Sequence, residues 1–178
     1  LILDEIQTGI GRLGTLFGYQ QFHVEPDIIT LAKGLGDGVP IGAFLANEKA
    51  AVFEPGDHGS TYGGNVLTCA AAVAATKVVL EEHVSAKADT TGRYLRYGLE
   101  ALKEKHNFIA DVRGMGLLLA MEFRDTISST VVSECNQEGL LLNAVRPNTV
   151  RFMPPLTTTI PEVDQALERL GRVLERIT

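Results

Sequence analysis

The chain has 178 residues, of which 45% are hydrophobic and 21% charged, and its formal net charge is −6, from 16 basic and 22 acidic residues. This composition excludes a disordered chain, and without a basic cluster it gives no reason to expect a nucleic-acid-binding surface. No apolar stretch is long and continuous enough to predict a membrane span. Cys69 and Cys135 fit no metal-ligand spacing, and they indicate a reducing, cytoplasmic location.

The first residues predict a strand in the middle of a domain. The chain begins without an initiator Met, and Leu1-Ile2-Leu3 is typical of a buried strand that ends at Asp4. A parallel strand buried on both faces needs neighbours that no earlier residue supplies. We therefore expect residues 1–178 to be the C-terminal portion of a longer polypeptide.

Short apolar runs alternate with Gly-rich turns in the first half of the chain. The expected elements are a short helix at Gly18–Phe22, strands at Ile28–Ala32 and Ile41–Ala46, and an Ala-rich helix from about Val66 to Glu82. Asn65 is placed to cap that helix, and its apolar composition predicts burial on most sides. This alternation is typical of an α/β fold with a mostly parallel sheet covered by helices.

The second half predicts a small α+β unit. Its expected helices are Ser85–His106, Ser128–Glu138 and a last helix that opens with a capping box, Thr159–Glu162; its expected strands are Ile109–Arg113, Leu117–Phe123, Leu140–Leu142 and Thr149–Phe152. Gly139 is a good helix-terminating glycine. We place the domain boundary near Val84, which gives domains of residues 1–83 and 84–178.

Three polar features stand at the expected edge of the first sheet. Lys33 directly follows an apolar strand and precedes three glycines, Asp4 ends the preceding strand, and Ser60-Thr61 lie in a Gly-rich loop before a helix. Each has an ordinary explanation: a solvated strand end, a turn cap or structural ion pair, and an N-cap loop. The carboxyl ends of α/β strands are also where such sheets bind ligands, and a helix N-terminus suits a phosphate.

One ligand would use all three features together. Pyridoxal 5′-phosphate needs a lysine amine that bonds to it covalently, a carboxylate against its ring nitrogen and a cradle for its phosphate. Lys33, Asp4 and the loop at Ser60-Thr61 match this set. No metal site is expected, because the four histidines show no ligand spacing.

Five motifs together resemble the class-III, ornithine-type aminotransferases of fold type I. They occur in the family's order, cover nearly the whole chain, and read LILDEIQTGIGRLG, PDIITLAKGLGDGVPIGA, HGSTYGGN, VRGMGLLLAMEF and VRFMPPL. The resemblance implies the C-terminal part of a large PLP-binding domain, followed by a small α+β domain. The run LLLNAVRPNTVRFMPPL is most similar to members that transfer an amino group from N-acetylornithine to 2-oxoglutarate, an arginine-biosynthesis step.

The resemblance also implies roles for individual residues. Asp4 matches the partner of the cofactor's ring nitrogen, Ile6 the aliphatic residue on one ring face, and Gln7 the glutamine near the phenolic oxygen. Lys33 matches the lysine that bonds to the cofactor and moves the substrate proton.

The resemblance implies roles for three more residues, which contact a phosphate or the substrate. Thr61, with Ser60 beside it, matches the residue that reaches the phosphate of the neighbouring subunit's cofactor, so the resemblance implies a homodimer. Arg151 matches the arginine that binds the substrate α-carboxylate, a task that suits a bidentate guanidinium.

The sequence departs from the family's pattern at three positions. Leu13 stands where many relatives have threonine, and Asp37 and Ala120 stand where glycine is frequent. None of these changes removes a group that carries out chemistry. Residues that the family supplies from its first half, including the same subunit's phosphate-binding turn, are not part of residues 1–178.

Other functions remain open at this point. The enzyme could act on succinylornithine, ornithine or 4-aminobutyrate instead, because the residues that choose among these substrates lie mostly in the family's first half. A binding module for a nucleotide is a second possibility, although no Walker-type or GxGxxG pattern supports it. Residues 1–178 alone could also be an inactive fragment.

Overall fold

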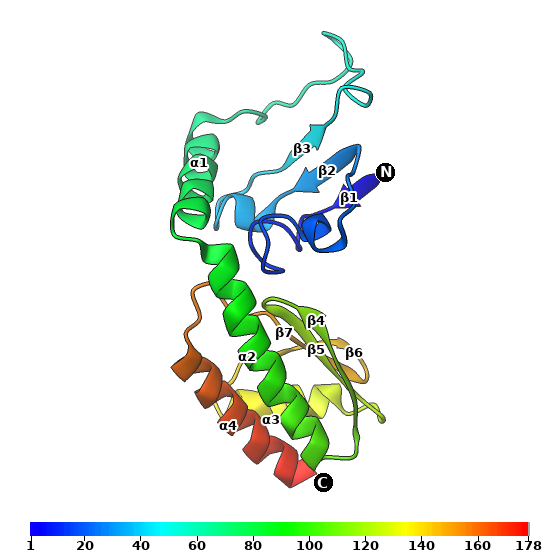
Figure 1. Cartoon of the computed structure of the whole chain (residues 1–178), viewed down its shortest axis with the longest axis vertical. Coiled ribbons are helices and arrows are strands. Elements are labelled where there is room, and N and C mark those ends of the chain that lie inside the picture. The colour runs from blue at the N-terminus through cyan, green and yellow to red at the C-terminus, as the bar shows by residue number, and fades with distance from the viewer. Residues whose placement is uncertain (178) are drawn as a thin grey trace. The chain divides into compact units, whose positions relative to one another are not determined.

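The computed structural model describes residues 1–177, and the chain divides into two compact units between Ala86 and Lys87 (Figure 1). The elements, in chain order, are β1 (Ile2–Asp4), η1 (Gly18–Phe22), β2 (Ile28–Leu31), η2 (Lys33–Leu35), β3 (Ala43–Ala46), α1 (Val66–Glu81), α2 (Val84–Lys105), β4 (Ile109–Met115), β5 (Leu118–Phe123), α3 (Ser128–Gln137), β6 (Asn143–Arg146), β7 (Thr149–Phe152) and α4 (Ile160–Ile177). Within residues 1–177, none of the helices has the length and continuous apolarity that crossing a bilayer requires.

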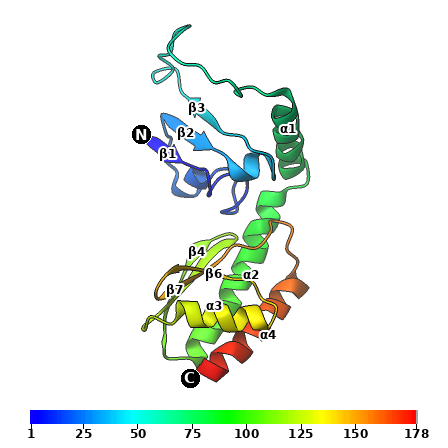
Figure 2. The same ribbon diagram turned by 180° about the vertical axis from the view of Figure 1, so that it is seen from behind.

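The first unit is built on a three-stranded sheet with β2 in the middle, as Figure 2 shows from behind. β1 and β2 are parallel, with Asp4 opposite Thr30, while β3 runs antiparallel to β2. Ile29 and Leu31 of β2 are buried, and Ile10 and Leu13 from the following loop join them. The α/β class expected from the sequence is confirmed.

Two expectations of burial in this unit are wrong for the described residues. β1 is an edge strand, and the side chains of Leu1 and Ile2 are 60% and 66% exposed. In α1 only Ala72 and Val79 are buried, although the helix contacts η2, and its other residues are half-buried or exposed. The cap of α1 is as expected, since Asn65 Oδ1 accepts hydrogen bonds from the backbone N–H groups of residues 67 and 68.

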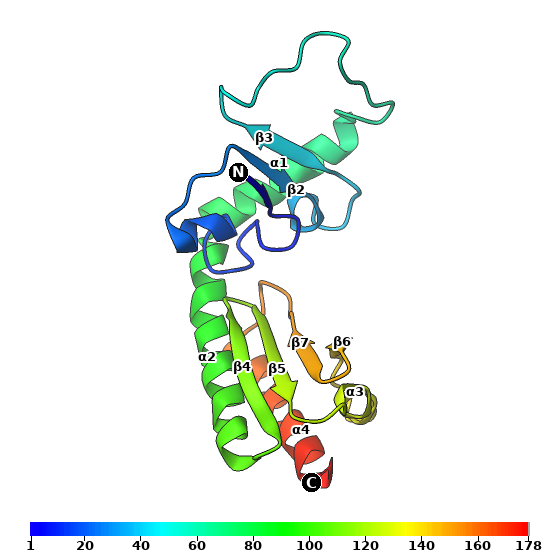
Figure 3. The same cartoon turned by 90° about the vertical axis from the view of Figure 1, so that its right-hand side faces the viewer.

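The second unit is an antiparallel four-stranded sheet in the order β4-β5-β7-β6 (Figure 3). One face of the sheet joins α2, α3 and α4 in a single hydrophobic core. Its largest fully buried side chains are Leu99, Val112, Leu117, Leu119, Met121, Phe123, Val131, Val150, Val163, Val173, Leu170 and Leu174. The apolar residues spaced along the two long helices, α2 and α4, therefore face this core.

Most local signals in this unit are confirmed, and one is wrong. Thr159 donates through its N–H and its hydroxyl to Glu162 Oε2, both at 2.8 Å, and Gly139 ends α3 with a φ of 74°. The strand expected at Leu140–Leu142 begins instead at Asn143. Leu140 N–H is bonded to the carbonyl of Cys135, so this apolar run completes the helix end before the strand can start.

Helix α2 approaches the β4–β5 turn with no space for a side chain at Gly92. A Cβ at this position would lie 2.0 Å from the carbonyl oxygen of Gly116, which is backbone and cannot rotate away. At Gly171 of α4, by contrast, a Cβ would lie 3.6 Å from the nearest atom, a methyl group of Leu102. The close contact at Gly92 explains why a helix interior carries a residue of poor helix propensity.

The substitution Gly92→Ala is expected to lower the free energy of unfolding by about 2–3 kcal/mol, because the helix must move away from the turn. Gly171→Ala should raise it by up to about 1 kcal/mol, because alanine favours the helix and has room. Denaturant unfolding of the two variants tests this contrast. Equal stability of the two variants would contradict the close approach.

The turn after β2 contains two non-glycine residues in the left-handed backbone region, Lys33 and Asp37, each with a φ of 46°. This conformation is unfavourable for residues with a Cβ but tolerable for aspartate. Glycine adopts this conformation without strain, so it would suit position 37 better than aspartate does. Ala120 lies inside β5 and is paired on both sides, so the same explanation does not extend to it.

Asp37→Gly is expected to raise the free energy of unfolding by about 1 kcal/mol, because glycine adopts a positive φ without strain. Ala120→Gly is the matched control, and it should lower stability by about 0.5–1 kcal/mol, since glycine weakens a strand interior. Thermal unfolding of both variants measures whether each substitution raises or lowers stability. A loss of stability in Asp37→Gly would contradict this account.

Candidate functional site

The parallel pairing of β1 and β2 brings two of the expected site residues to one edge of the sheet. Asp4 is the last residue of β1 and pairs with Thr30, three residues before Lys33. Its Oδ1 accepts hydrogen bonds from Ile6 N–H at 2.9 Å and from Thr30 Oγ1 at 3.2 Å. The carboxylate thus caps the turn that follows β1 while remaining exposed.

Lys33 begins the single turn η2, two residues after the end of β2. Its side chain is exposed, and its positive φ is unusual for a lysine. It lines a hollow of about 440 Å³ together with Gly34 and the residues from Asp37 to Ile41. Strained backbone of this kind persists only where the surroundings hold it, and it is found disproportionately at functional sites.

The loop that carries Ile6 and Gln7 is fixed by a buried acid, Glu5, whose side chain is 3% exposed. Its carboxylate accepts hydrogen bonds from Gly18 N–H at 3.0 Å, from Tyr19 N–H at 2.7 Å and from the Thr8 hydroxyl. These bonds tie the start of the loop to η1, so the half-buried Ile6 and Gln7 are held beside the end of β1.

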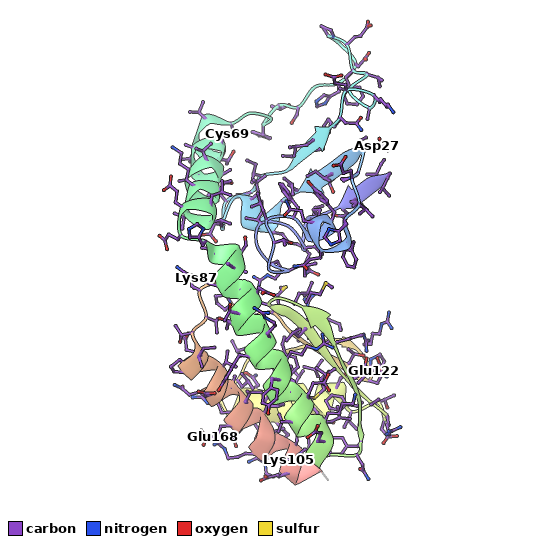
Figure 4. The ribbon with its side chains drawn as sticks, in the orientation of Figure 1. Asp27, Cys69, Lys87, Lys105, Glu122 and Glu168 are labelled. Atoms are coloured by element: carbon purple, nitrogen blue, oxygen red, sulfur yellow. The ribbon has the colours of Figure 1, made fainter. Side chains whose placement is uncertain are left out.

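The loop that carries Ser60 and Thr61 borders a second hollow, of about 600 Å³, which shares Pro40 and Ile41 with the hollow at Lys33. Ser60 and the following glycines line it, whereas Thr61 is exposed outside its lining. Cys69, labelled in Figure 4, lies in the first turns of α1 on the same border. Asn65 accepts hydrogen bonds from two amides of α1, and the loop before it offers the hydroxyl groups of Ser60 and Thr61 as donors.

Arg151 belongs to the second unit, in β7, between Ala120 of β5 and Asn143 of β6. Its Nη2 donates a hydrogen bond to Asn143 Oδ1 at 2.8 Å. Both residues line a hollow of about 420 Å³ whose other walls are mainly apolar, from Leu140–Leu142 and Phe152–Pro155. Bonds from Thr159 lower the pKa of Glu162, so this wall residue is an anion at neutral pH.

The structure therefore groups the expected residues in two sets. Asp4, Ile6, Gln7 and Lys33 stand at or beside the ends of two paired strands, with Ser60 on an adjoining hollow. Arg151 lies in the other unit, at a hollow of its own.

Other reactive groups give no competing site in the part of the chain that is described. Burial raises the pKa of the Cys135 thiol to about 11, which leaves it a poor nucleophile. No three histidine, cysteine, aspartate or glutamate side chains within residues 1–177 come together to hold a metal ion.

The sequence did not identify Glu5 and Asn143 as residues of the candidate site. An acid placed directly after Asp4 and before a Gly-rich loop is a possible sign of a loop anchor. Asn143 and Arg151 stand at equal distances from Pro147, so a hairpin centred there would have paired them.

Comparison with known proteins places the chain in a family. The model of the family described as "Aminotransferase class-III" matches residues 1–174. The chain is 50% identical over 176 residues to an acetylornithine aminotransferase from Caldanaerobacter subterraneus subsp. tengcongensis, covering 99% of this chain and 45% of that protein. The chain thus spans about half the length of the curated relatives it matches.

Solved structures agree. An acetylornithine aminotransferase from Elizabethkingia anophelis superposes with a TM-score of 0.93 and 38% identity, covering 98% of this chain and 47% of its own. An ornithine δ-aminotransferase from Plasmodium falciparum superposes with a TM-score of 0.92 and 37% identity. The match covers 98% of this chain and 46% of that protein. On the family match over 174 residues, the chain is a member of the class-III aminotransferases.

Proposed function

We propose that the protein carrying this chain is a PLP-dependent aminotransferase that transfers the amino group of N-acetylornithine to 2-oxoglutarate, giving N-acetylglutamate semialdehyde and glutamate. The observation that best supports this proposal is the position of Lys33. Its amine is exposed, its backbone is strained, and it follows β2, next to the strand that ends in Asp4. Class-III aminotransferases use pyridoxal phosphate, and a related ornithine aminotransferase is described with PLP at its active site.

The residues around Lys33 fit this cofactor. An amine, a carboxylate and an amide side chain come from Lys33, Asp4 and Gln7. The hollow beside the amine is lined by Gly34 and residues 37–41, and Asp4 and Gln7 lie outside its lining. Lys33 would hold the cofactor covalently, Asp4 would keep its ring nitrogen protonated, Gln7 would contact its phenolic oxygen, and Ile6 would pack on the ring. When bound, pyridoxal phosphate stabilises the negative charge left as the substrate Cα loses its proton.

Within this proposal Lys33 has a second task, because its Nζ takes the proton from the substrate Cα. A general base must lie within hydrogen-bond reach of the proton it removes. The fixed backbone of η2, in which Leu35 and Gly36 donate to the carbonyls of Ala32 and Lys33, would keep the amine in place. Arg151 would bind the α-carboxylate of each substrate in turn through its guanidinium fork.

A homodimer is part of the proposal. Ser60 and Thr61 would contact the phosphate of the cofactor held by the partner subunit, which gives their exposed hydroxyl groups a function. The neighbouring segment supports this, because its apolar side chains are unusually exposed, with Val66 at 84% and Leu67 at 75%. Apolar surface of this extent is typical of an interface.

The choice of amino donor follows the relatives. Acetylornithine aminotransferases from several organisms are 42–50% identical to this chain. Ornithine aminotransferases match the fold equally well at 37% identity, so ornithine is the second candidate donor, ahead of succinylornithine and 4-aminobutyrate.

The remaining assignments complete the proposal. We assign residues 1–83 to the large PLP-binding domain and residues 84–178 to the small C-terminal domain. A cytoplasmic location suits the two free thiols, Cys69 and Cys135.

Borohydride reduction of the complete protein with pyridoxal phosphate, followed by peptide mapping, is expected to attach the cofactor to Lys33. Lys33→Ala should lose the label and at least about a thousandfold in transamination rate, because the bond and the general base are lost together. Lys49→Ala, which removes an exposed lysine of the same unit, should keep both.

Attachment at another lysine, or no attachment, would refute the role of Lys33. A thermal shift with ATP or NAD but none with pyridoxal phosphate would favour the nucleotide-binding alternative. Comparison of N-acetylornithine, ornithine, succinylornithine and 4-aminobutyrate as donors tests the substrate.

A further inference from the structure

We propose that Asn143 is a second substrate-binding residue, which orients Arg151 through its carbonyl oxygen and donates a hydrogen bond from its Nδ2 to the same substrate carboxylate. This inference rests on the proposed function, because it assigns Arg151 to the carboxylate. It adds the side chain of Asn143 to the carboxylate-binding site at Arg151, and it explains why this side chain must be a neutral amide.

The hairpin of β6 and β7 fixes the two residues side by side. Asn143 and Arg151 are directly opposite in the antiparallel register, so their side chains leave the same face of the sheet. On the other side Arg151 is paired with Ala120, whose small side chain leaves room for the guanidinium. The bond from Arg151 Nη2 to Asn143 Oδ1, at 2.8 Å, joins the pair.

The chemistry of this bond orients the amide. A guanidinium only donates, so the atom of Asn143 that faces it must be the carbonyl oxygen. The amide Nδ2 is bonded to the same carbon and therefore points away from Arg151 with two hydrogens. Among residues 1–177 no protein group accepts a hydrogen bond from this nitrogen, while Asn143 is exposed and lines the 420 Å³ hollow with Arg151.

A carboxylate matches this arrangement of donors. It has two oxygens with about four acceptor sites, and a guanidinium fork occupies two of them. The amide of Asn143 would add a neutral donor beside the fork. The other walls of the hollow are mainly apolar, from Leu140–Leu142 and Phe152–Pro155, so Arg151 and Asn143 are its main hydrogen-bond donors.

The charged neighbours on this face are already engaged with each other. Glu122 of β5, labelled in Figure 4, accepts hydrogen bonds from Arg113 Nη1 at 2.5 Å and from Asn148 Nδ2 at 3.2 Å. An acid at position 143 would instead place a negative charge directly on Arg151, where it would compete with the substrate. This difference between asparagine and aspartate gives the inference its test.

The test uses the complete enzyme with Asn143→Ala and Asn143→Asp. Asn143→Ala should raise KM for 2-oxoglutarate about tenfold with little change in kcat, because a hydrogen bond to a charged group is lost. Asn143→Asp should raise it about a hundredfold, although the side chains have the same shape. Binding of 2-oxoglutarate to the cofactor-free protein, measured by calorimetry, should weaken in the same order.

Each outcome supports or overturns the inference. Wild-type KM and binding in Asn143→Asp would overturn it, because the lost donor and the added charge should both weaken binding of the carboxylate. Unchanged KM in Asn143→Ala would also overturn it. Asn136→Asp, which adds the same charge at an exposed position of α3, should behave as wild type, and melting curves should show all variants folded.

The same experiments distinguish failure of the proposed function. A wild-type protein with no label at Lys33 and no transamination would refute the aminotransferase proposal itself. A wild-type protein that is labelled and active, but with Asn143 variants equal to it in KM and binding, would refute only the role of Asn143.

Discussion

The parallel pairing of β1 with β2 is the constraint on which the candidate chemistry depends. It sets Asp4 level with Thr30, and the chain then needs only three residues to reach Lys33. Neither side chain comes from a flexible loop tip, because Asp4 ends a strand and the turn at Lys33 is tied by backbone hydrogen bonds. The buried carboxylate of Glu5 extends this order to Ile6 and Gln7. A carboxylate and an amine are thereby held on a rigid frame.

Local rules predicted much of the fold. Asn65, Gly139 and the Thr159–Glu162 pair end or begin helices where the sequence indicated, because these signals act within a few residues. The periodic apolar residues of α2 and α4 likewise face the core. The strand predicted at Leu140–Leu142 is wrong. The composition of this run suits a strand, but the N–H of Leu140 donates to the carbonyl of Cys135 and completes the end of α3. Short apolar runs carry no information about such competition.

The site was predictable in part, and the limit has a physical cause. Asp4 and Lys33 follow apolar strands, a pattern that sequence displays directly. The exposure of α1 was not predictable. Its apolar residues are not confined to one face, so the sequence does not indicate which face packs against the rest of the unit. Asn143 was hidden for a different reason: its partner Arg151 is adjacent only after the hairpin forms. Cross-strand neighbours depend on register, which a single sequence leaves open.

That register limits how the hairpin can change in evolution. A one-residue insertion or deletion at Pro147-Asn148 would slip β6 along β7 and bring a neighbour of Asn143 opposite Arg151, while the amide of Asn143 would turn to the other face of the sheet. The bulge between Ala144 and Arg146 already absorbs one irregularity near the turn. Members of the family that retain an amide beside this arginine should therefore conserve the length of the turn, even where its residues differ.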